Sequence, residues 1–242
     1  MLAHKNKSHE LEPRVETPLL GARVYEAIKE AILSLKIRPG EVLTIGRLAS
    51  QLGASRTPVR DAFLILEREG LVTIVPQKGT YVAMISPQDV HDIFELRIVL
   101  ESYASHVAAT RVTPEELDRV EATLQEANWA FAQGEKIQAA DMGRPVHDLV
   151  VRKVGNERLV RGLNDLETHY TRIRHFAVMI PNRFERSNQQ HHAILAALRE
   201  GDAERSGQAM TEHLSSIRDD VLANLGSWTI QIENGTTATS LK

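Results

Sequence analysis

The stretch LASQLGASRTPVRDAFLILEREGLV, residues 48–72, decides how the first third of this chain folds. Its apolar residues recur at helical spacing on both sides of Gly53. Ser55 is a good helix N-cap, and Pro58 is tolerated in the first turn that follows. The stretch therefore predicts a short helix, a turn at Gly53 and a second helix that ends at Gly70, which is the helix-turn-helix layout.

The flanking sequence completes a small domain. An apolar helical period begins at Leu19 and stops before Arg38-Pro39-Gly40, a strong turn signal. After Gly70, two β-rich runs flank Pro76-Gln-Lys-Gly79, which indicates a β-hairpin. Residues 18–84 are therefore predicted to form a winged helix-turn-helix of three helices and a hairpin.

The sequence after Ser86 is predicted to be helical throughout. Thr113-Pro-Glu-Glu116 is a full capping box, and no strand-like alternation competes with the helical period. The apolar helical period runs through residues 90–109, 117–131, 146–154, 159–180, 193–198 and 209–225. We expect a mainly α protein in which residues 85–225 form an antiparallel bundle of about six helices. Residues 1–17 and 226–242 are polar and are predicted to be flexible tails.

Composition restricts the location and the partners of the chain. Cysteine is absent, Met1–Glu10 is polar, and no apolar run approaches the roughly 20 residues of a membrane span, so we expect a cytoplasmic protein that does not enter membranes. The net charge is −3. Residues 1–85 nevertheless carry 12 Lys and Arg against 9 Asp and Glu, whereas the remainder carries 17 against 23. A basic first third is compatible with one domain that faces DNA.

The predicted second helix carries the residue types that read DNA. Such a helix contacts base edges from its N-terminal turn, where Arg56 and Thr57 stand, and Arg60 follows one turn later. The arginine fork fits a guanine edge or a phosphate, and the hairpin tip at Lys78 suits the DNA backbone or the minor groove. A single arginine is most simply a solvated charge. The ordered combination of helix, turn, paired arginines and hairpin favours double-stranded DNA as a partner.

These segments resemble the winged-helix domain of GntR-type transcriptional regulators over residues 18–84. The resemblance is carried by Ser55-Arg-Thr-Pro-Val-Arg60, Leu66-Glu-Arg-Glu-Gly-Leu-Val72 and Lys78-Gly-Thr-Tyr-Val82. Gly46 departs from the pattern, because many members carry a DNA-contacting arginine there, and Arg47 is its neighbour. The residues expected to bind DNA are Arg47, Ser55, Arg56, Thr57, Arg60, Lys78, Gly79 and Thr80.

The remainder is similar, over about residues 88–222, to the FCD sensor domain of the FadR branch of these regulators. The matching residues are Phe94-Glu-Leu-Arg97, Glu101, His147, Gly155-Asn156, His191, Ala197, Gly201-Asp202 and His213. The resemblance implies that His147, His191 and His213, with an Asp or Asn, hold a divalent metal such as Zn or Ni. It also implies that Arg97 helps to bind a small organic acid.

The acidic metal ligand departs from this pattern. The family places it four residues before the first histidine, where this chain has Gly143. Asp141 is a possible substitute if Gly143 and Pro145 break the helix and let it reach from a loop. Five further histidines are interpreted as surface or helix-face residues, namely His91, His106, His169, His175 and His192.

Together these features predict a homodimeric, ligand-responsive repressor that binds a palindromic operator. One alternative is a metal-free dimeric DNA-binding protein without an effector. Another is a metal-dependent hydrolase in which three histidines activate a water. The sequence lacks HExxH, G-x-S-x-G and phosphate-loop motifs and offers no general base beside the histidines, so we do not expect an enzyme.

Overall fold

The computed structural model describes the backbone of residues 17–233 and the side chains of residues 20–226. The chain forms two compact units. The first contains the described residues up to Glu30 together with Val42–Tyr81, and the second contains Ala31–Glu41 and the chain from Val82 onward. The chain thus crosses between the units three times, whereas the sequence predicted one boundary at residues 84–85.

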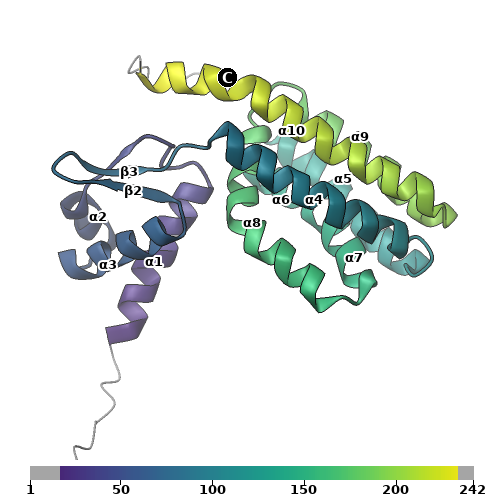
Figure 1. The fold of residues 1–242 in the computed structure, drawn as a ribbon, viewed down its shortest axis with the longest axis horizontal. Coiled ribbons are helices and arrows are strands. Elements are labelled where there is room, and N and C mark those ends of the chain that lie inside the picture. Colours follow the sequence, from purple (N-terminus) through teal and green to yellow (C-terminus); the bar gives the residue numbers. More distant parts are fainter. Residues whose placement is uncertain (1–16, 234–242) are drawn as a thin grey trace, which may run out of the picture. The chain divides into compact units, whose positions relative to one another are not determined.

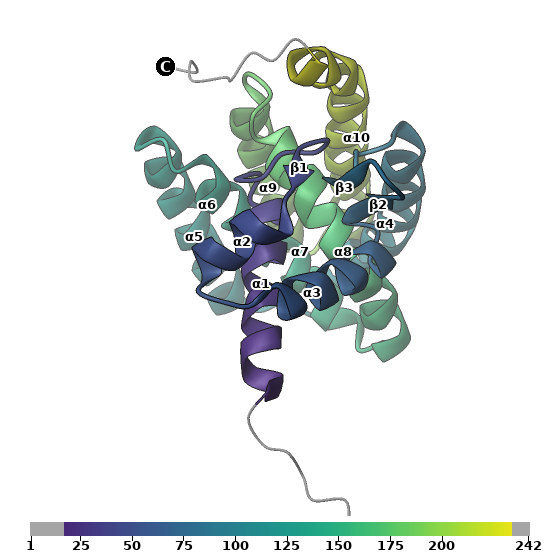
Figure 2. The same cartoon turned by 90° about the vertical axis from the view of Figure 1, so that its left-hand side faces the viewer.

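The first unit is the predicted winged helix-turn-helix (Figures 1 and 2). Its sheet has the order β1-β3-β2, and β1 runs antiparallel to β3 with Val42 opposite Tyr81. The two-residue β1 was not predicted, because so short a strand has no detectable alternation. The elements are α1 (Thr17–Leu33), β1 (Val42–Leu43), α2 (Ile45–Leu52), α3 (Arg56–Arg68), β2 (Val72–Val75) and β3 (Gly79–Val82).

Local sequence explains the helix-turn-helix. Gly53 ends α2 in the left-handed conformation at φ 61°, where glycine has no side chain to strain. Helix α3 buries Val59, Phe63 and Leu66, which are no more than 2% exposed. Because these residues share one face of α3, the opposite face is left to solvent.

The second unit is a bundle of seven helices among the described residues. Helices α4 and α10 lie side by side along it (Figure 1). Ser86 caps α4 by accepting a hydrogen bond from the Asp89 backbone, and the predicted capping box of Thr113 and Glu116 starts α5. The helices are α4 (Pro87–Ala108), α5 (Pro114–Ala132), α6 (Lys136–Asp141), α7 (Arg144–Val154), α8 (Glu157–Ala177), α9 (Arg183–Glu200) and α10 (Ala203–Glu233). The mainly α fold class is confirmed.

Two details of the predicted bundle are wrong. Helix α6 was missed, because six residues are too few to show a helical period. The predicted tail from residue 226 is helical as far as Glu233, since one glycine inside a long helix costs only about 1 kcal/mol. The other predicted tail residues, 1–16 and 234–242, lie outside the described part of the chain. Among the residues described, no helix is both long and apolar enough to cross a membrane.

Candidate functional site

The first candidate site is the solvent face of α3. Arg56 and Thr57 lie in its first turn and Arg60 one turn later, and all three side chains are exposed. Ser55 occupies the N-cap position but makes no capping hydrogen bond with its side chain. Arg47 is exposed on α2. The residues of α3 that are predicted to read DNA therefore lie on its solvent face, while the opposite face of the helix packs into the core.

The hairpin tip exposes the other predicted contacts. Lys78 and Gly79 are exposed and Thr80 is half-buried. The tip closes through a hydrogen bond from the Lys78 amide to the Val75 carbonyl. Gly79 has φ 133°, and the Tyr81 hydroxyl donates to the Lys78 carbonyl, so the wing presents a single lysine on an ordered turn.

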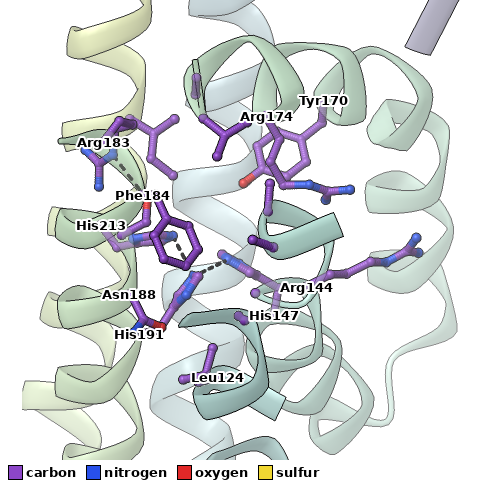
Figure 3. Close-up of a pocket in the computed structure, with 18 residues that line it drawn as sticks. Leu124, Arg144, His147, Tyr170, Arg174, Arg183, Phe184, Asn188, His191 and His213 are labelled. Carbon is purple, nitrogen blue, oxygen red and sulfur yellow. Dashed lines mark hydrogen bonds between the residues drawn. The ribbon is translucent and has the colours of Figure 1, made fainter. Parts of the chain in front are cut away.

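The second candidate site is a cluster of three buried histidines in the bundle. His147 comes from α7, His191 from α9 and His213 from α10. Figure 3 shows the three rings together, with His191 between the other two. The Nε2 atom of His191 lies 3.3 Å from Nε2 of His147 and 3.1 Å from Nε2 of His213. One nitrogen from each ring thus lies within 4.8 Å of the others, which is close enough to share one ion.

The outer nitrogens of two of these rings are fixed by hydrogen bonds. Nδ1 of His147 lies 2.5 Å from a carboxylate oxygen of Glu101, and Nδ1 of His213 lies 3.2 Å from the side-chain oxygen of Gln190. Both partners are acceptors, so each Nδ1 carries the proton and donates it. The Nε2 lone pairs of both rings consequently face the centre of the cluster. Carboxylate and amide partners orient metal-binding histidines in the same way.

Burial disfavours the charged form of two rings of the cluster, His191 and His213. The pKa values of His191 and His213 are lowered well below 6.5, first by burial and then by neighbouring histidines and Arg183. Neutral imidazoles are the form that binds metal. Nε2 of His191 lies within hydrogen-bond distance of Nε2 of both other rings, and a cation that replaces the proton between them would find one nitrogen of each ring around it. The cluster therefore fits a divalent metal on chemical grounds, with three nitrogen ligands that suit Zn²⁺.

Asp141 does not join this cluster. It ends α6, and its carboxylate accepts hydrogen bonds from Arg174 at 2.6 Å and from Nε2 of His175 at 2.8 Å. Burial alone would raise the pKa of Asp141, but the hydrogen bond and charge of His175, together with Arg174, lower it. The break between α6 and α7 does occur, yet the carboxylate is bound elsewhere.

Gly143 explains why no other side chain completes the cluster from this direction. A Cβ atom at Gly143 would lie 2.6 Å from Cε1 of His191. The position is thus aimed at the cluster, but the His191 ring fills the space that an acidic side chain would need.

Arg97 lies behind the cluster rather than in the cavity. It is 4% exposed, pairs with Glu101 at 2.7 Å, and stacks on the Tyr170 ring with 3.4 Å between its Cζ atom and the ring centroid. Burial would raise the pKa of Glu101, but the charges of Arg97 and His147 lower it. Arg97 therefore holds the carboxylate that orients His147, and it is not among the residues that line the neighbouring cavity.

A cavity opens beside the three histidines (Figure 3). Its walls are largely apolar and include Leu124 and Phe184. Three arginines that the sequence did not predict at the site also line it: Arg144, Arg174 and Arg183. Arg183 is satisfied within the protein, because it donates to Ser216, Asp220 and Gln190. Only the packing of α7 and α8 reveals that Arg144 and Arg174 belong to the cavity lining.

His175 contradicts its expected surface location. It is 4% exposed, and its two ring nitrogens contact the Asp141 carboxylate and the Leu33 carbonyl. His91 and His106 are exposed as predicted, while His169 and His192 are half-buried. Spacing along the helix gave no signal for His175, because both of its partners are distant in the sequence.

Comparison with known proteins identifies the family of each unit. Residues 20–82 match the family described as bacterial regulatory proteins, gntR family, and residues 92–216 match the FCD domain. The HTH-type transcriptional repressor RspR of Escherichia coli (strain K12) is 26% identical over 86% of this chain and 93% of its own. The Nta operon transcriptional regulator of Aminobacter aminovorans is 30% identical over 78% of this chain and 89% of its own.

A solved structure has the same fold. A putative GntR transcriptional regulator from Rhodococcus sp. RHA1 superposes with a TM-score of 0.69 at 22% identity, over 84% of this chain and 97% of that chain. The family matches cover the winged helix-turn-helix and most of the bundle, and the relatives are transcriptional regulators rather than enzymes. This chain therefore belongs to the GntR family of DNA-binding transcriptional regulators, with an FCD domain as its second unit.

Proposed function

We propose that this regulator is a homodimeric repressor whose FCD domain binds a divalent metal and a small carboxylate that changes its affinity for DNA. The observation that carries the proposal is the convergence of one nitrogen each from His147, His191 and His213 beside a cavity. Repression is supported by relatives named as repressors, among them RspR and a probable D-xylose utilization operon repressor.

The proposed metal ligands are the three histidines alone. Among the side chains that the structure describes, no carboxylate joins the three histidines, because Asp141 is bound by Arg174 and His175. A bound Zn²⁺ or Ni²⁺ would supply a Lewis acid with open coordination positions. A site with three neutral ligands leaves the full charge of the ion to attract an anion.

The arginines that line the cavity support an anionic effector. Arg174 is 13% exposed and Arg144 is 45% exposed, and both residues belong to the cavity lining. Arginine binds carboxylates in a planar, two-pronged geometry. We assign the effector contact to these residues rather than to Arg97, which is committed to Glu101 and Tyr170.

The homodimer is supported by an exposed apolar stripe on α4. Leu96, Val99 and Tyr103 are 51%, 64% and 55% exposed, and their spacing places them on one face of the helix. Aromatic and aliphatic side chains in a row are typical of the centre of a protein interface. Two copies joined here would present two α3 helices to a palindromic operator.

Metal analysis tests the proposal. Chelator-stripped protein would be titrated with Zn²⁺ and Ni²⁺, and thermal unfolding would be followed with a panel of small carboxylates, with and without metal. We expect one metal per chain, and stabilisation by at least one acid only when metal is bound.

A matched pair of variants provides the control. His191→Ala should abolish metal uptake, whereas His192→Ala, at the next position on α9, should retain it, because His192 points to Glu121 instead. The metal proposal is overturned if the wild-type protein takes up no metal, or if both variants behave alike.

A further inference from the structure

One side of helix α8 lines the cavity. Another side contacts the chain near the points where it passes from one unit to the other, at residues 30–31, 41–42 and 81–82, which are called crossings below. Tyr170 and Arg174 line the cavity and are spaced four residues apart (Figure 3). Arg172 and His175 are spaced three apart, and at about 100° per residue Arg172 lies on the face opposite Arg174. His175 lies between these two directions.

Arg172 and His175 each bind a backbone carbonyl at a crossing. His175 Nδ1 lies 2.8 Å from the carbonyl oxygen of Leu33, the last residue of α1. Arg172 donates to the carbonyl of Ala83, which directly follows β3. The chain enters the second unit at Ala31 and again at Val82, so both bonds are within two residues of a crossing.

The third crossing, at residues 41–42, is hydrogen-bonded to the crossing at residues 81–82. The Gly40 amide donates to the Val82 carbonyl at 2.8 Å, and the Val82 amide donates to the Glu41 carbonyl at 3.0 Å. The chain returns to the first unit at Val42. Two crossings are therefore hydrogen-bonded to α8 directly, and the third is hydrogen-bonded to α8 only through the segment at Val82.

Asp141 connects the cavity to one of these bonds. Its Oδ1 atom lies 2.6 Å from Arg174 and 2.8 Å from Nε2 of His175. An anion that binds the Arg174 guanidinium competes with Asp141 for the same donors. Asp141 is half exposed, so once released it can turn to water, and Nε2 of His175 then loses the partner that holds the ring against the Leu33 carbonyl.

We infer that Arg174, Asp141 and His175 form a relay that reports the state of the cavity to the C-terminal end of α1. Arg174 is the sensing residue, and Asp141 and His175 are positioning residues that hold Leu33. The inference rests on the proposed function only in that the effector is an anion that enters this cavity. The relay itself is a property of the protein without metal or effector.

Hydrogen exchange of the full-length, chelator-stripped protein tests the relay without any ligand. The amides of Leu35 and Ile37 donate to Ile32 and Ala31 and so report on the end of α1. Arg174→Gln should raise their exchange rates about fivefold, the effect of losing one hydrogen bond. The amides of α9 should be unchanged, which excludes general destabilisation.

Two further variants make the result specific. Arg144→Gln removes another arginine of the cavity lining, but one paired with Asp148 and Glu167 rather than Asp141, so it should leave Leu35 and Ile37 unchanged. In a His175→Phe background, Arg174→Gln should have no additional effect on these amides, because the relay is already broken.

The relay is overturned if Arg174→Gln matches Arg144→Gln, or if its effect persists in the His175→Phe background. Either result leaves the Zn²⁺ titration of the three histidines untouched. Conversely, a protein that takes up no metal can still show the exchange pattern, so failure of the relay and failure of the proposed function are distinguishable.

Discussion

At the scale of single residues, the histidine cluster depends on groups that do not themselves face its centre. Glu101 is fully buried and binds Nδ1 of His147, and Arg97 holds Glu101 in turn. A carboxylate that accepts a hydrogen bond from the outer nitrogen makes an imidazole a stronger ligand. The role of Arg97 is therefore to keep Glu101 ionised in a buried site, which burial alone would oppose.

Replacing Glu101 should weaken metal binding without removing a ligand. We expect Glu101→Gln to lower the affinity for Zn²⁺ by roughly 10- to 100-fold, because the charge behind His147 is lost while a hydrogen-bond acceptor remains. Competition with a chromogenic chelator measures this. Glu121→Gln is the matched control, since Glu121 contacts His192 outside the cluster. Equal affinities of the two variants would contradict the assignment.

The buried histidines also set a pH dependence for the metal-free protein. Their pKa values are lowered in the folded state, so below about pH 6.5 the unfolded chain binds more protons than the folded chain. Stability should therefore fall as the pH decreases from 7 to 5, by up to about 1.4 kcal/mol per pH unit for each of His191 and His213.

Urea unfolding of chelator-stripped protein across this range measures the slope. The double variant His191→Gln/His213→Gln should flatten it. The lowered pKa values of Glu101 and Asp141 contribute separately, since their stabilisation is lost only as the pH falls below the ordinary carboxyl range. A slope unchanged in the double variant would show that other groups are responsible.

At the scale of elements, the sequence predicted what is decided locally. Ser86, Thr113 and Gly53 are cap or turn residues, and the helices begin and end beside them. The orientation of α8 is decided instead by packing against segments distant in the sequence. For that reason Arg174 was missed as a cavity residue, and His175 was expected at the surface although it reaches Leu33.

The histidine cluster and Arg97 likewise differ in how well the sequence predicts their positions. The resemblance to FCD domains predicted His147, His191 and His213, and the structure brings these three together. It also suggested Arg97 as an effector contact. Arg97 is buried against Tyr170 and is not among the residues that line the cavity, so its contact with an effector stays a prediction.

Helix α3 is the element whose substitution should change DNA recognition. We expect Arg56→Ala to weaken binding to DNA selected by the wild-type protein from a random pool by roughly 5- to 150-fold, the effect of losing a two-pronged contact to a base. Sequence preference should relax at one position. Arg68→Ala is the control, because Arg68 is exposed at the opposite end of the same helix.

Fluorescence anisotropy at several salt concentrations separates the possible roles of Arg56. A phosphate contact would weaken binding to all sequences equally and reduce the salt dependence by about one counterion. Equal loss in Arg56→Ala and Arg68→Ala would mean that α3 does not enter the groove by its N-terminal turn.

At the scale of the whole molecule, the proposed regulation requires two copies. One winged helix-turn-helix reads a short half-site, and a two-fold axis doubles the contact and makes the operator palindromic. The apolar stripe on α4 is the surface we assign to this axis. Helix α4 also carries Arg97 and Glu101 on its buried face. The proposed dimer surface and the residues that orient His147 therefore lie on the same helix.

A charge placed in the stripe should separate the copies. Val99 is 64% exposed at its centre, so Val99→Glu should not disturb the bundle core, but it would bury two carboxylates against each other in a dimer. We expect sedimentation equilibrium to show monomers for this variant at concentrations where the wild type is dimeric. Affinity for a palindromic DNA should fall more than affinity for a half-site.

Trp129→Glu supplies the matched control for this prediction. Trp129 is 66% exposed on α5, away from the stripe, and its replacement adds the same charge to the same unit. The control should remain dimeric and bind palindromic DNA as the wild type does, because the added charge remains in water. If Trp129→Glu dissociates the dimer and Val99→Glu does not, α5 rather than α4 forms the two-fold interface, and the supporting role of α4 behind the histidines is then independent of assembly.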